Sequence, residues 1–319
     1  MNSETGKVEI PEISIIIVSW NVRELLKACL NSIYRTKEGL PVEVIVVDGG
    51  SEDGSQLMVE QSFPDVKLIA RPDNIGFPTG NNIGISQSAG RNVLLLNPDT
   101  EIISNALEEL SSYLDENRDV GVVAAQLLNP DGTVQSSRRR FPTLATGVFE
   151  STWLQPMAPG SIQRNYYFED EPSDAVLDVD WVVGACLMVR RSVVEQVGLL
   201  DEDYFMYSEE LDWCRRIKTA GWRVVYLPTA QIIHYVGKSS EQALVERHIN
   251  FQRAKLRYFR KYHGPWAALL IRLVLIINYS WQLVVEAAKG AVGHKRDLRW
   301  QRVKVYWLVL RSGLPPAGY

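Results

Sequence analysis

The chain has 319 residues, of which 46% are hydrophobic and 23% are charged, and its net charge at pH 7 is −4. These ordinary globular values exclude a disordered, collagen-like or low-complexity chain, and the length allows one large domain or two smaller ones. Three cysteines (Cys29, Cys186 and Cys214) lie far apart without CxxC spacing. This excludes a disulfide scaffold and a cysteine zinc cluster and suits a reducing compartment. The beginning of the chain is polar and acidic, so we expect no secretory signal.

The charge is divided unevenly along the chain. Residues 251–319 carry 13 lysines and arginines and two acids, a net charge of +11, whereas the first 250 residues carry 21 basic and 36 acidic residues, a net charge of −15. This tail also holds four of the nine tryptophans. Basic residues mixed with Trp and Tyr are typical of a segment that binds an anionic membrane surface. We expect no nucleic-acid partner, because the tail is strongly apolar between its charges and contains no recognisable nucleic-acid module.

Predicted strands and helices alternate through the first 128 residues. Continuous apolar, β-branched runs predict strands that are covered on both faces, and segments with helical spacing or with Gly, Asn and Asp follow them. The alternation predicts an α/β fold with a mostly parallel sheet and helices on both faces. The predicted strands are 13–20, 42–48, 66–70, 92–96 and 120–128, and the predicted helices are 22–34, 53–61, a helix that opens within 74–84 and lasts to about 88, and 105–116.

The middle of the chain is less regular. Prolines and glycines interrupt residues 129–178, which we interpret as a loop that partly covers the site. Regular structure is predicted again over 179–190, followed by a helix over 209–220 that ends at Gly221. A last strand is predicted over 222–227, with His234 in the segment beyond it.

The tail is predicted to be helical. A basic helix over 241–262 ends at Gly264-Pro265, a nearly apolar segment covers 266–288, and a basic, Trp-rich segment covers 297–311. The apolar segment just reaches the roughly 20 residues that span a bilayer. It contains Arg272 near one end, so we favour a helix that lies in the interface and keep a spanning helix as the alternative. A helical subdomain packed on the core, or a dimer interface, is the competing interpretation.

Polar side chains follow the predicted strands at the edge where parallel sheets bind their ligands. Asp48 and Asp53 lie in the Gly-rich loop after the second strand, where a carboxylate can accept hydrogen bonds from a base or a ribose. A turn with a helix-capping aspartate is the structural alternative. Asp99 ends the sequence Asn97-Pro98-Asp99 after the fourth strand, and its oxygens suit Mg²⁺ or Mn²⁺. A helix-capping turn is again the alternative.

A second group of candidates lies later in the chain. Glu209, Glu210 and Asp212 fall at the start of a predicted helix, where the helix dipole also favours acids for purely structural reasons. Adjacent residues on a helix project about 100° apart, so one acid can face a site while its neighbour packs. His234 follows a predicted strand, and a lone histidine is more often structural than a ligand.

The order of these signals along the chain is specific. Over about residues 12–240 the chain resembles the family 2 glycosyltransferases, and within them the rhamnosyltransferase branch, whose members build bacterial cell-surface polysaccharides. The stretch DGTVQSSRRRFPT also looks like that branch. The segments that carry the resemblance are SIIIVSWN, VIVVDGGSEDGS, NIGFPTGNNIG, LLLNPDT, the long segment from WVVGACLMVRR to GWRVVYLP, and IIHYVGKSS.

The resemblance implies a GT-A fold, a Rossmann-like catalytic domain over residues 1–240, with a nucleotide-sugar half at about 12–128 and an acceptor half at about 129–240. Residues 241–319 would form the membrane-associating helical tail. The activity implied is that of an inverting hexosyltransferase that uses Mg²⁺ or Mn²⁺. It would move a sugar from a nucleotide diphosphate donor to a lipid-linked or glycan acceptor. The donor that matches the branch best is dTDP-rhamnose, and UDP donors stay open. The location expected is the cytoplasmic face of the inner membrane, and the oligomeric state stays open.

The resemblance also implies roles for individual residues. Glu210 matches the general base of the family's Glu-Asp pair, and Glu209 is the alternative because the usual Asp is Glu210 here. Asp99 matches a metal ligand, and His234 matches a histidine that helps to bind metal or diphosphate. The nucleotide-sugar-binding residues would be Asp48, Asp53, Asn74, Gly80, Asn82 and Asn97. The acceptor-side candidates are Asp212, Trp181 and Arg140.

Other functions fit the sequence less well. A nucleotidyltransferase should show a Gly-rich, Lys/Arg-bearing phosphate loop after the first strand, where this chain reads SWNVRELL. A processive polymer synthase usually carries several membrane helices and a QxxRW-type segment, and this sequence has neither. A catalytically degenerate scaffold or glycan-binding subunit would not need the acids that this chain retains. Donor binding without donor hydrolysis would support that last alternative.

Overall fold

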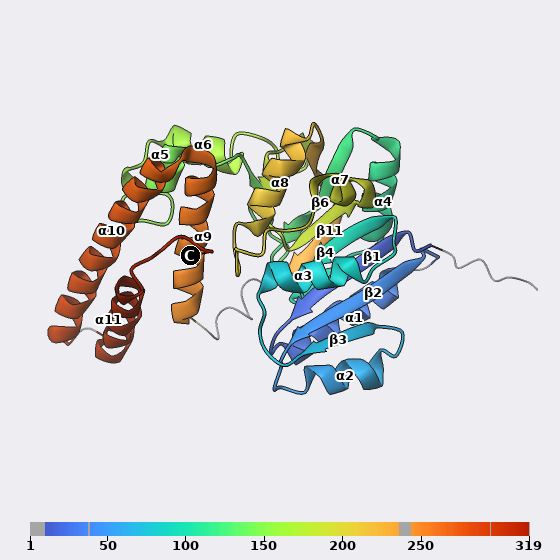
Figure 1. Cartoon of the computed structure of the whole chain (residues 1–319), viewed down its shortest axis with the longest axis horizontal. Coiled ribbons are helices and arrows are strands. Elements are labelled where there is room, and N and C mark those ends of the chain that lie inside the picture. The colour runs from blue at the N-terminus through green and yellow to red at the C-terminus, as the bar shows by residue number, and fades with distance from the viewer. Residues whose placement is uncertain (1–9, 38, 236–243, 294, 319) are drawn as a thin grey trace, which may run out of the picture.

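The computed structural model describes residues 10–37, 39–235, 244–293 and 295–318 of the chain. In these ranges a nine-stranded sheet carries helices on both faces, and three long helices from the end of the chain stand beside it (Figure 1). The predicted α/β architecture is confirmed, and most predicted elements lie within a few residues of their predicted bounds. The predicted start of the tail helix at 241, and with it the domain boundary at 240, lies outside the described residues.

The main sheet is mixed rather than uniformly parallel. Its strands are β1 (Ile13–Ser19), β2 (Val42–Gly49), β3 (Lys67–Arg71), β4 (Asn92–Leu96), β5 (Thr100–Ile102), β6 (Val120–Leu128), β8 (Leu177–Asp178), β10 (Cys186–Arg190) and β11 (Arg223–His234). The order is β3-β2-β1-β4-β10-β6-β11-β5, with β8 paired to β11. The first four strands are parallel, as predicted. β10 is inserted antiparallel between β4 and β6, and β11 is parallel to β6.

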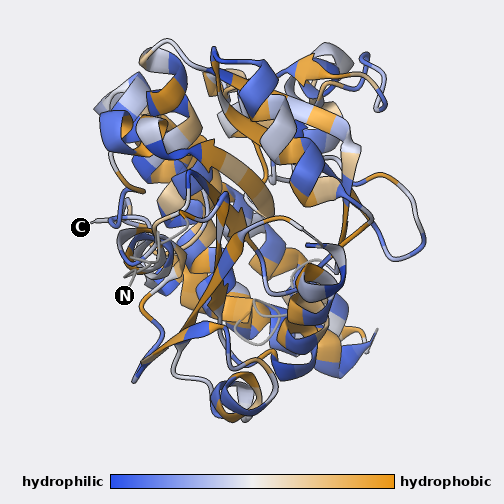
Figure 2. Cartoon of the chain, turned by 90° about the vertical axis from the view of Figure 1, so that its right-hand side faces the viewer, coloured by the Kyte–Doolittle hydropathy of each residue, from blue (hydrophilic) through white to orange (hydrophobic). Residues whose placement is uncertain are grey.

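Two apolar layers enclose the sheet, because successive side chains of a strand point to opposite faces. Ile15 and Ile17 of β1 pack in the layer under the first group of helices, whereas Ile16 belongs to the opposite layer. The first group is α1 (Arg23–Thr36), α2 (Ser55–Ser62) and α4 (Ala106–Glu116), and the second is α3 (Phe77–Ser86), α7 (Arg191–Val197) and α8 (Glu209–Thr219). Figure 2 shows the result: apolar strands lie inside, and the helices carry apolar residues on one side and polar residues on the other.

Residues 129–178 differ from the loop that the sequence predicts. They form β7 (Arg138–Arg139), which pairs with β9 (Trp181–Val182), and the short helices α5 (Leu144–Phe149), η1 (Gln155–Met157) and α6 (Gly160–Tyr167). Helix α5 packs closely on the C-terminal helices. A Cβ atom built on Gly147 would lie 2.6 Å from Phe259 Cζ and 2.7 Å from Ile271 Cδ1. The segment therefore connects the sheet to the C-terminal helices.

The last strand is also longer than predicted. The expected end at residue 227 is wrong, because β11 continues to His234 and pairs with β6 and β5. The register shifts between Leu227 and Gln231, the stretch that holds Pro228. Proline cannot donate a ladder hydrogen bond and is tolerated at such irregularities, so the sequence signal for the strand stops before the strand does.

The C-terminal helices form a third apolar cluster. They are α9 (Leu244–His263), α10 (Pro265–Ala291) and α11 (Arg296–Arg311). Gly264, with φ of +88°, and Pro265 in the first turn of α10 separate the first two, as predicted. Helix α10 is long and apolar enough to cross a membrane by length and composition, but 28% of its apolar window is buried against the protein.

Candidate active site

A cavity of about 520 Å³ opens at the edge where β1, β2 and β4 end. Because β10 runs antiparallel, its beginning reaches the same edge, and the backbone N–H of Asn97 donates to the carbonyl of Ala185 at 2.9 Å. The cavity is lined by residues from the ends of these strands, from the start of α8 and from α9. Six predicted site residues line it: Asn74, Asn97, Asp99, Glu209, Glu210 and His234.

Asp99 and His234 meet at the end of the sheet. The register pairs His234 of β11 with Thr100 of β5, and the backbone N–H of Tyr235 donates to the Asp99 carbonyl at 2.9 Å. This pairing places His234 Nε2 3.4 Å from Asp99 Oδ1, with both side chains buried. No group of three His, Cys, Asp or Glu residues suited to a metal occurs among the described residues. Two protein ligands fit a divalent cation that takes its remaining ligands from phosphate oxygens and water, and Asp99 supplies the carboxylate that Mg²⁺ usually binds.

Glu209 and Glu210 face the cavity from the first turn of α8. The Oε2 atoms of both carboxyl groups lack a hydrogen-bond partner. Burial raises the pKa of Glu209 well above the usual glutamate value, and the neighbouring Glu210 carboxylate raises it further. Burial also raises the pKa of Glu210, which lies beside Gly184 of the cavity wall. A carboxylate whose pKa is raised toward neutrality is a stronger general base than an exposed one.

An unusual backbone conformation positions α8. Tyr207 and Ser208 precede the helix with φ values of +75° and +64°, a region that costs residues other than glycine about 1–3 kcal/mol each. The Ser208 side chain makes no capping hydrogen bond. The Tyr207 ring packs edge-on against Phe251 of α9 at 5.6 Å between centroids. The conformation directs the first turn of α8, with its two glutamates, into the cavity.

The carboxylates of Asp48 and Asp53 bind groups of the protein in and around the loop between β2 and α2. Asp48 is fully buried, and its carboxylate accepts hydrogen bonds from the backbone N–H of Ser51 at 2.9 Å and from Gln56 Nε2 at 2.7 Å. Asp53 accepts from the backbone N–H of Arg23 at 2.7 Å. Both carboxylates thus shape the loop between β2 and α2, and neither is among the described residues that line the cavity. Their predicted contact with the nucleotide stays a prediction.

Gly80 and Asn82 of α3 have packing contacts. A Cβ atom on Gly80 would lie 2.8 Å from the Val18 methyl groups, so glycine lets α3 approach β1 closely. Asn82 binds Leu200 twice, accepting from its backbone N–H at 3.0 Å and donating to its carbonyl at 2.9 Å. These contacts hold α3 and the loop before α8 together beside the cavity. A direct role of either residue in nucleotide binding stays a prediction.

The acceptor-side candidates make contacts outside the cavity. Asp212 is fully buried and pairs with Lys261 Nζ at 2.7 Å and Arg216 Nε at 2.9 Å, which fastens α8 to α9. Trp181 Nε1 donates to the Arg140 carbonyl at 2.9 Å. None of the three candidates is among the described residues that line the cavity. A role in acceptor binding therefore stays a prediction for each of them.

Helix α9 also contributes to the cavity, which the sequence did not predict. Glu246, Arg247 and Asn250 from its first turns line the cavity. The sequence identifies a basic amphipathic helix here but carries no local signal that this helix returns to the sheet edge. Only the long-range packing of α9 on α8 brings these residues to the site.

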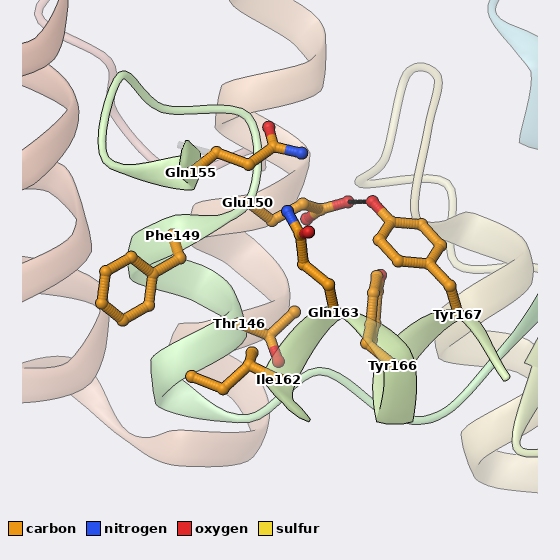
Figure 3. A pocket seen from close by; sticks show the side chains of 8 residues that line it. All are labelled: Thr146, Phe149, Glu150, Gln155, Ile162, Gln163, Tyr166 and Tyr167. Carbon is orange, nitrogen blue, oxygen red and sulfur yellow. Dashed lines mark hydrogen bonds between the residues drawn. The ribbon is translucent and has the colours of Figure 1, made fainter. Parts of the chain in front are cut away.

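A second, much smaller cavity lies between α5 and α6 (Figure 3). Its volume is about 10 Å³, which is near the lower limit for one water molecule. The Glu150 side chain lies beside the Tyr167 hydroxyl, which donates to Glu150 Oε1 at 3.5 Å. None of the predicted site residues lines it. The large cavity is therefore the candidate active site.

Comparison with known proteins identifies the family. The sequence model of the family described as Glycosyl transferase family 2 matches residues 14–198. The chain belongs to this family. The matched segment contains the candidate site residues from Asp48 to Trp181, and α8 and His234 follow it. The chain is therefore a glycosyltransferase with rhamnosyltransferase relatives.

Two relatives and one solved structure illustrate the family likeness. The chain is 30% identical over 270 residues to an N-acetylglucosaminyl-diphospho-decaprenol L-rhamnosyltransferase of Mycobacterium tuberculosis, covering 76% of this chain and 87% of the relative. It is 29% identical over 227 residues to the rhamnosyltransferase WbbL of Escherichia coli, covering 61% and 83%. The mannosyltransferase PcManGT of Pyrobaculum calidifontis, solved with GDP-Man and Mn²⁺, has a TM-score of 0.55 and 16% identity, covering 96% of this chain and 88% of that chain. This last likeness confirms the GT-A fold.

Proposed function

We propose that the protein is an inverting, metal-dependent rhamnosyltransferase that moves rhamnose from dTDP-rhamnose to a lipid-linked saccharide in cell-surface polysaccharide synthesis. The observation that carries the proposal is that a possible metal site and a pair of buried carboxyl groups line the same cavity. Asp99 and His234, which lie 3.4 Å apart, line the cavity together with Glu209 and Glu210, whose pKa values are raised. An inverting transfer needs both a site for the diphosphate and a base for the acceptor hydroxyl.

Glu210 is the proposed base. Its carboxylate takes the proton of the acceptor hydroxyl as the oxygen attacks the anomeric carbon from the face opposite the diphosphate. The bond from the anomeric carbon to the diphosphate oxygen breaks, and the diphosphate leaves with the electron pair. A divalent cation held by Asp99 and His234 would neutralise the charge that develops on the diphosphate.

The donor and the acceptor are inferred from the relatives. Two relatives are rhamnosyltransferases, and the mycobacterial one is named for a diphospho-decaprenol acceptor. The Mn²⁺ in the mannosyltransferase structure supports a divalent cation without distinguishing Mg²⁺ from Mn²⁺. A lipid-linked acceptor requires that the cavity lie at a membrane surface. The three cysteines are buried and free, which suits the proposed cytoplasmic face of the membrane.

Helix α10 offers the surface for that contact. The residues that it exposes between Trp266 and Ala288 include no charged side chain. Its buried polar groups are paired with the protein: Asn278 Oδ1 accepts from the backbone N–H of Trp153 at 2.9 Å, and Glu286 binds Arg299 at 2.7 Å. The exposed apolar residues of this stripe are Trp266, Leu269, Leu270, Leu273, Ile277, Trp281 and Val284.

The stripe supports a helix that lies in the interface rather than one that spans the bilayer. Its residues recur at helical spacing on one side of α10, over a length of about 27 Å. The opposite side packs on α9 and α11, and Arg272 binds the Gly313 carbonyl there. Trp153 extends the stripe, with its ring 6.5 Å from that of Trp281. A peripheral or monotopic attachment buries this stripe and leaves the packed side in contact with the protein.

A thermal-shift panel tests the proposed function. Nucleoside diphosphates are added to the wild-type protein and to Asp99→Asn, with and without Mn²⁺. A ligand at a hundred times its Kd stabilises a protein by about 2.7 kcal/mol, which is readily measured. We expect dTDP to stabilise the wild type more strongly with Mn²⁺ and the variant to lose that difference. Equal shifts in the two proteins would contradict the metal assignment, and donor binding without transfer would favour a degenerate scaffold.

A further inference from the structure

Gln135 lies against His234 because a tight turn follows β6. The backbone N–H of Asn129 donates to the Thr133 carbonyl at 2.7 Å and closes the turn. The backbone N–H of Gln135 then donates to the Leu127 carbonyl at 2.8 Å. The turn thus returns the chain along the end of β6, next to β11, and brings the Gln135 side chain to the histidine.

The side-chain amide of Gln135 has one orientation that satisfies its neighbours. Its Nε2 atom lies 2.6 Å from the His234 carbonyl oxygen and 3.2 Å from the Leu128 carbonyl oxygen. Carbonyl oxygens only accept hydrogen bonds, so the atom facing them is the NH₂ donor. The Oε1 atom therefore faces His234 Nδ1, at 3.0 Å. Since Oε1 is an acceptor, the hydrogen of this contact belongs to Nδ1.

The second ring nitrogen of His234 faces Asp99. Nε2 lies 3.4 Å from Asp99 Oδ1, and both side chains are buried. A neutral imidazole that carries its hydrogen on Nδ1 has a lone pair on Nε2. The lone pair and the carboxylate repel each other unless a cation binds both. Histidines that ligate metals usually have this arrangement, with the other ring N–H held by a hydrogen bond from outside the metal site.

We propose that Gln135 is a positioning residue that holds His234 in its Nδ1–H tautomer and so directs the Nε2 lone pair to a divalent cation shared with Asp99. This inference rests on the proposed function, because it assigns the cation to Asp99 and His234. The competing arrangement is an imidazolium paired directly with Asp99, in which both ring nitrogens carry hydrogen.

The tautomer is tested in the wild-type protein with dTDP and Mg²⁺, a diamagnetic cation that leaves the spectra sharp. Long-range ¹H–¹⁵N spectra of ¹⁵N-histidine-labelled protein distinguish the two neutral tautomers from the imidazolium by the shifts of the ring nitrogens. The chain has four histidines, and a His234→Asn sample identifies the signal of that residue. We expect the Nδ1–H form in this complex. An Nε2–H tautomer or an imidazolium there would overturn the proposal.

Metal affinity gives the second test. We expect Gln135→Met to weaken Mn²⁺ binding in the presence of dTDP by about 10-fold to 100-fold, measured by the EPR signal of free Mn²⁺. Gln126→Met is the matched control, because Gln126 also uses its amide to bind neighbours, the Tyr226 hydroxyl at 2.8 Å and the Ser173 carbonyl at 2.9 Å. The control should keep wild-type affinity.

The outcomes separate this inference from the proposed function. If folded Gln135→Met binds Mn²⁺ as the wild type does while Asp99→Asn loses binding, Gln135 has no positioning role and the metal site stands. If the wild type itself binds no Mn²⁺ with dTDP, both the metal dependence and the role of Gln135 are overturned. The thermal midpoint of each variant shows whether it is folded.

Discussion

Membrane attachment through α10 makes a quantitative prediction for Leu273 and Ile277. Their side chains are 50% and 60% exposed in the middle of the apolar stripe. Complete burial of such a side chain contributes about 1.5–3 kcal/mol, so insertion of the exposed parts contributes about 1 kcal/mol or slightly more for each. The double variant Leu273→Ser/Ile277→Ser therefore loses about 2–3 kcal/mol of membrane affinity, which is roughly 30-fold to 140-fold weaker binding.

The assay is sedimentation of the full chain with vesicles that contain anionic and neutral phospholipids. Leu57→Ser is the matched control, since Leu57 is 56% exposed on α2, on the opposite side of the molecule from α10 (Figure 1). The control should bind as the wild type does. Thermal unfolding checks that both variants are folded. Wild-type binding by the folded double variant would refute the assignment of this face to the membrane, and equal losses in both variants would show that the effect is not local.

Three further predictions concern the site. Glu210→Gln should lower kcat by about 10²-fold to 10⁴-fold while dTDP affinity is kept; full sugar transfer by this variant would move the base to Glu209. Because burial and Glu210 raise the pKa of Glu209, the folded state retains a proton that the unfolded chain releases, and stability falls as the pH rises from the usual glutamate range toward the raised pKa. Glu209→Gln removes this titration. The thermal midpoint of the variant should therefore exceed that of the wild type by more at pH 8 than at pH 4. An equal difference between the two midpoints at both pH values would contradict the raised pKa of Glu209. Gly80→Ala forces a methyl group to within 2.8 Å of Val18 and should destabilise the fold by about 1–3 kcal/mol in denaturant titrations; unchanged stability with lost dTDP binding would instead support direct contact of Gly80 with the nucleotide.

Local patterns in the sequence predicted much of the catalytic half. The apolar runs of β1, β2, β4 and β6 predicted strands at nearly their observed positions, because strands covered on both faces must be apolar throughout. The same reasoning placed Asp99 at a strand end, since parallel strands bring their carboxyl ends to one edge. The order of the motifs predicted the family, and the match over residues 14–198 confirms it.

Long-range packing decided the features that the sequence did not predict. The antiparallel insertion of β10 between β4 and β6 has no local signal, because a strand run does not indicate its direction. Local sequence also did not predict which acids reach the site. Asp48 and Asp99 both follow strands, but the Asp48 carboxylate binds the backbone N–H of Ser51 in its own loop, whereas the Asp99 carboxylate lies beside His234. Arg247 reaches the cavity only because α9 packs on α8.

The sequence by itself therefore determined the strands, the helices, the family and most of the acids that reach the cavity. These follow from periodicity and motif order, which act over a few residues. The tertiary structure decided which of the polar groups share one cavity and which instead form hydrogen bonds or ion pairs within the protein. It also decided which side of α10 stays exposed. These depend on contacts between residues such as Gln135 and His234, which are 99 positions apart. No pattern within a short window encodes such a contact, because it forms only when the sheet assembles.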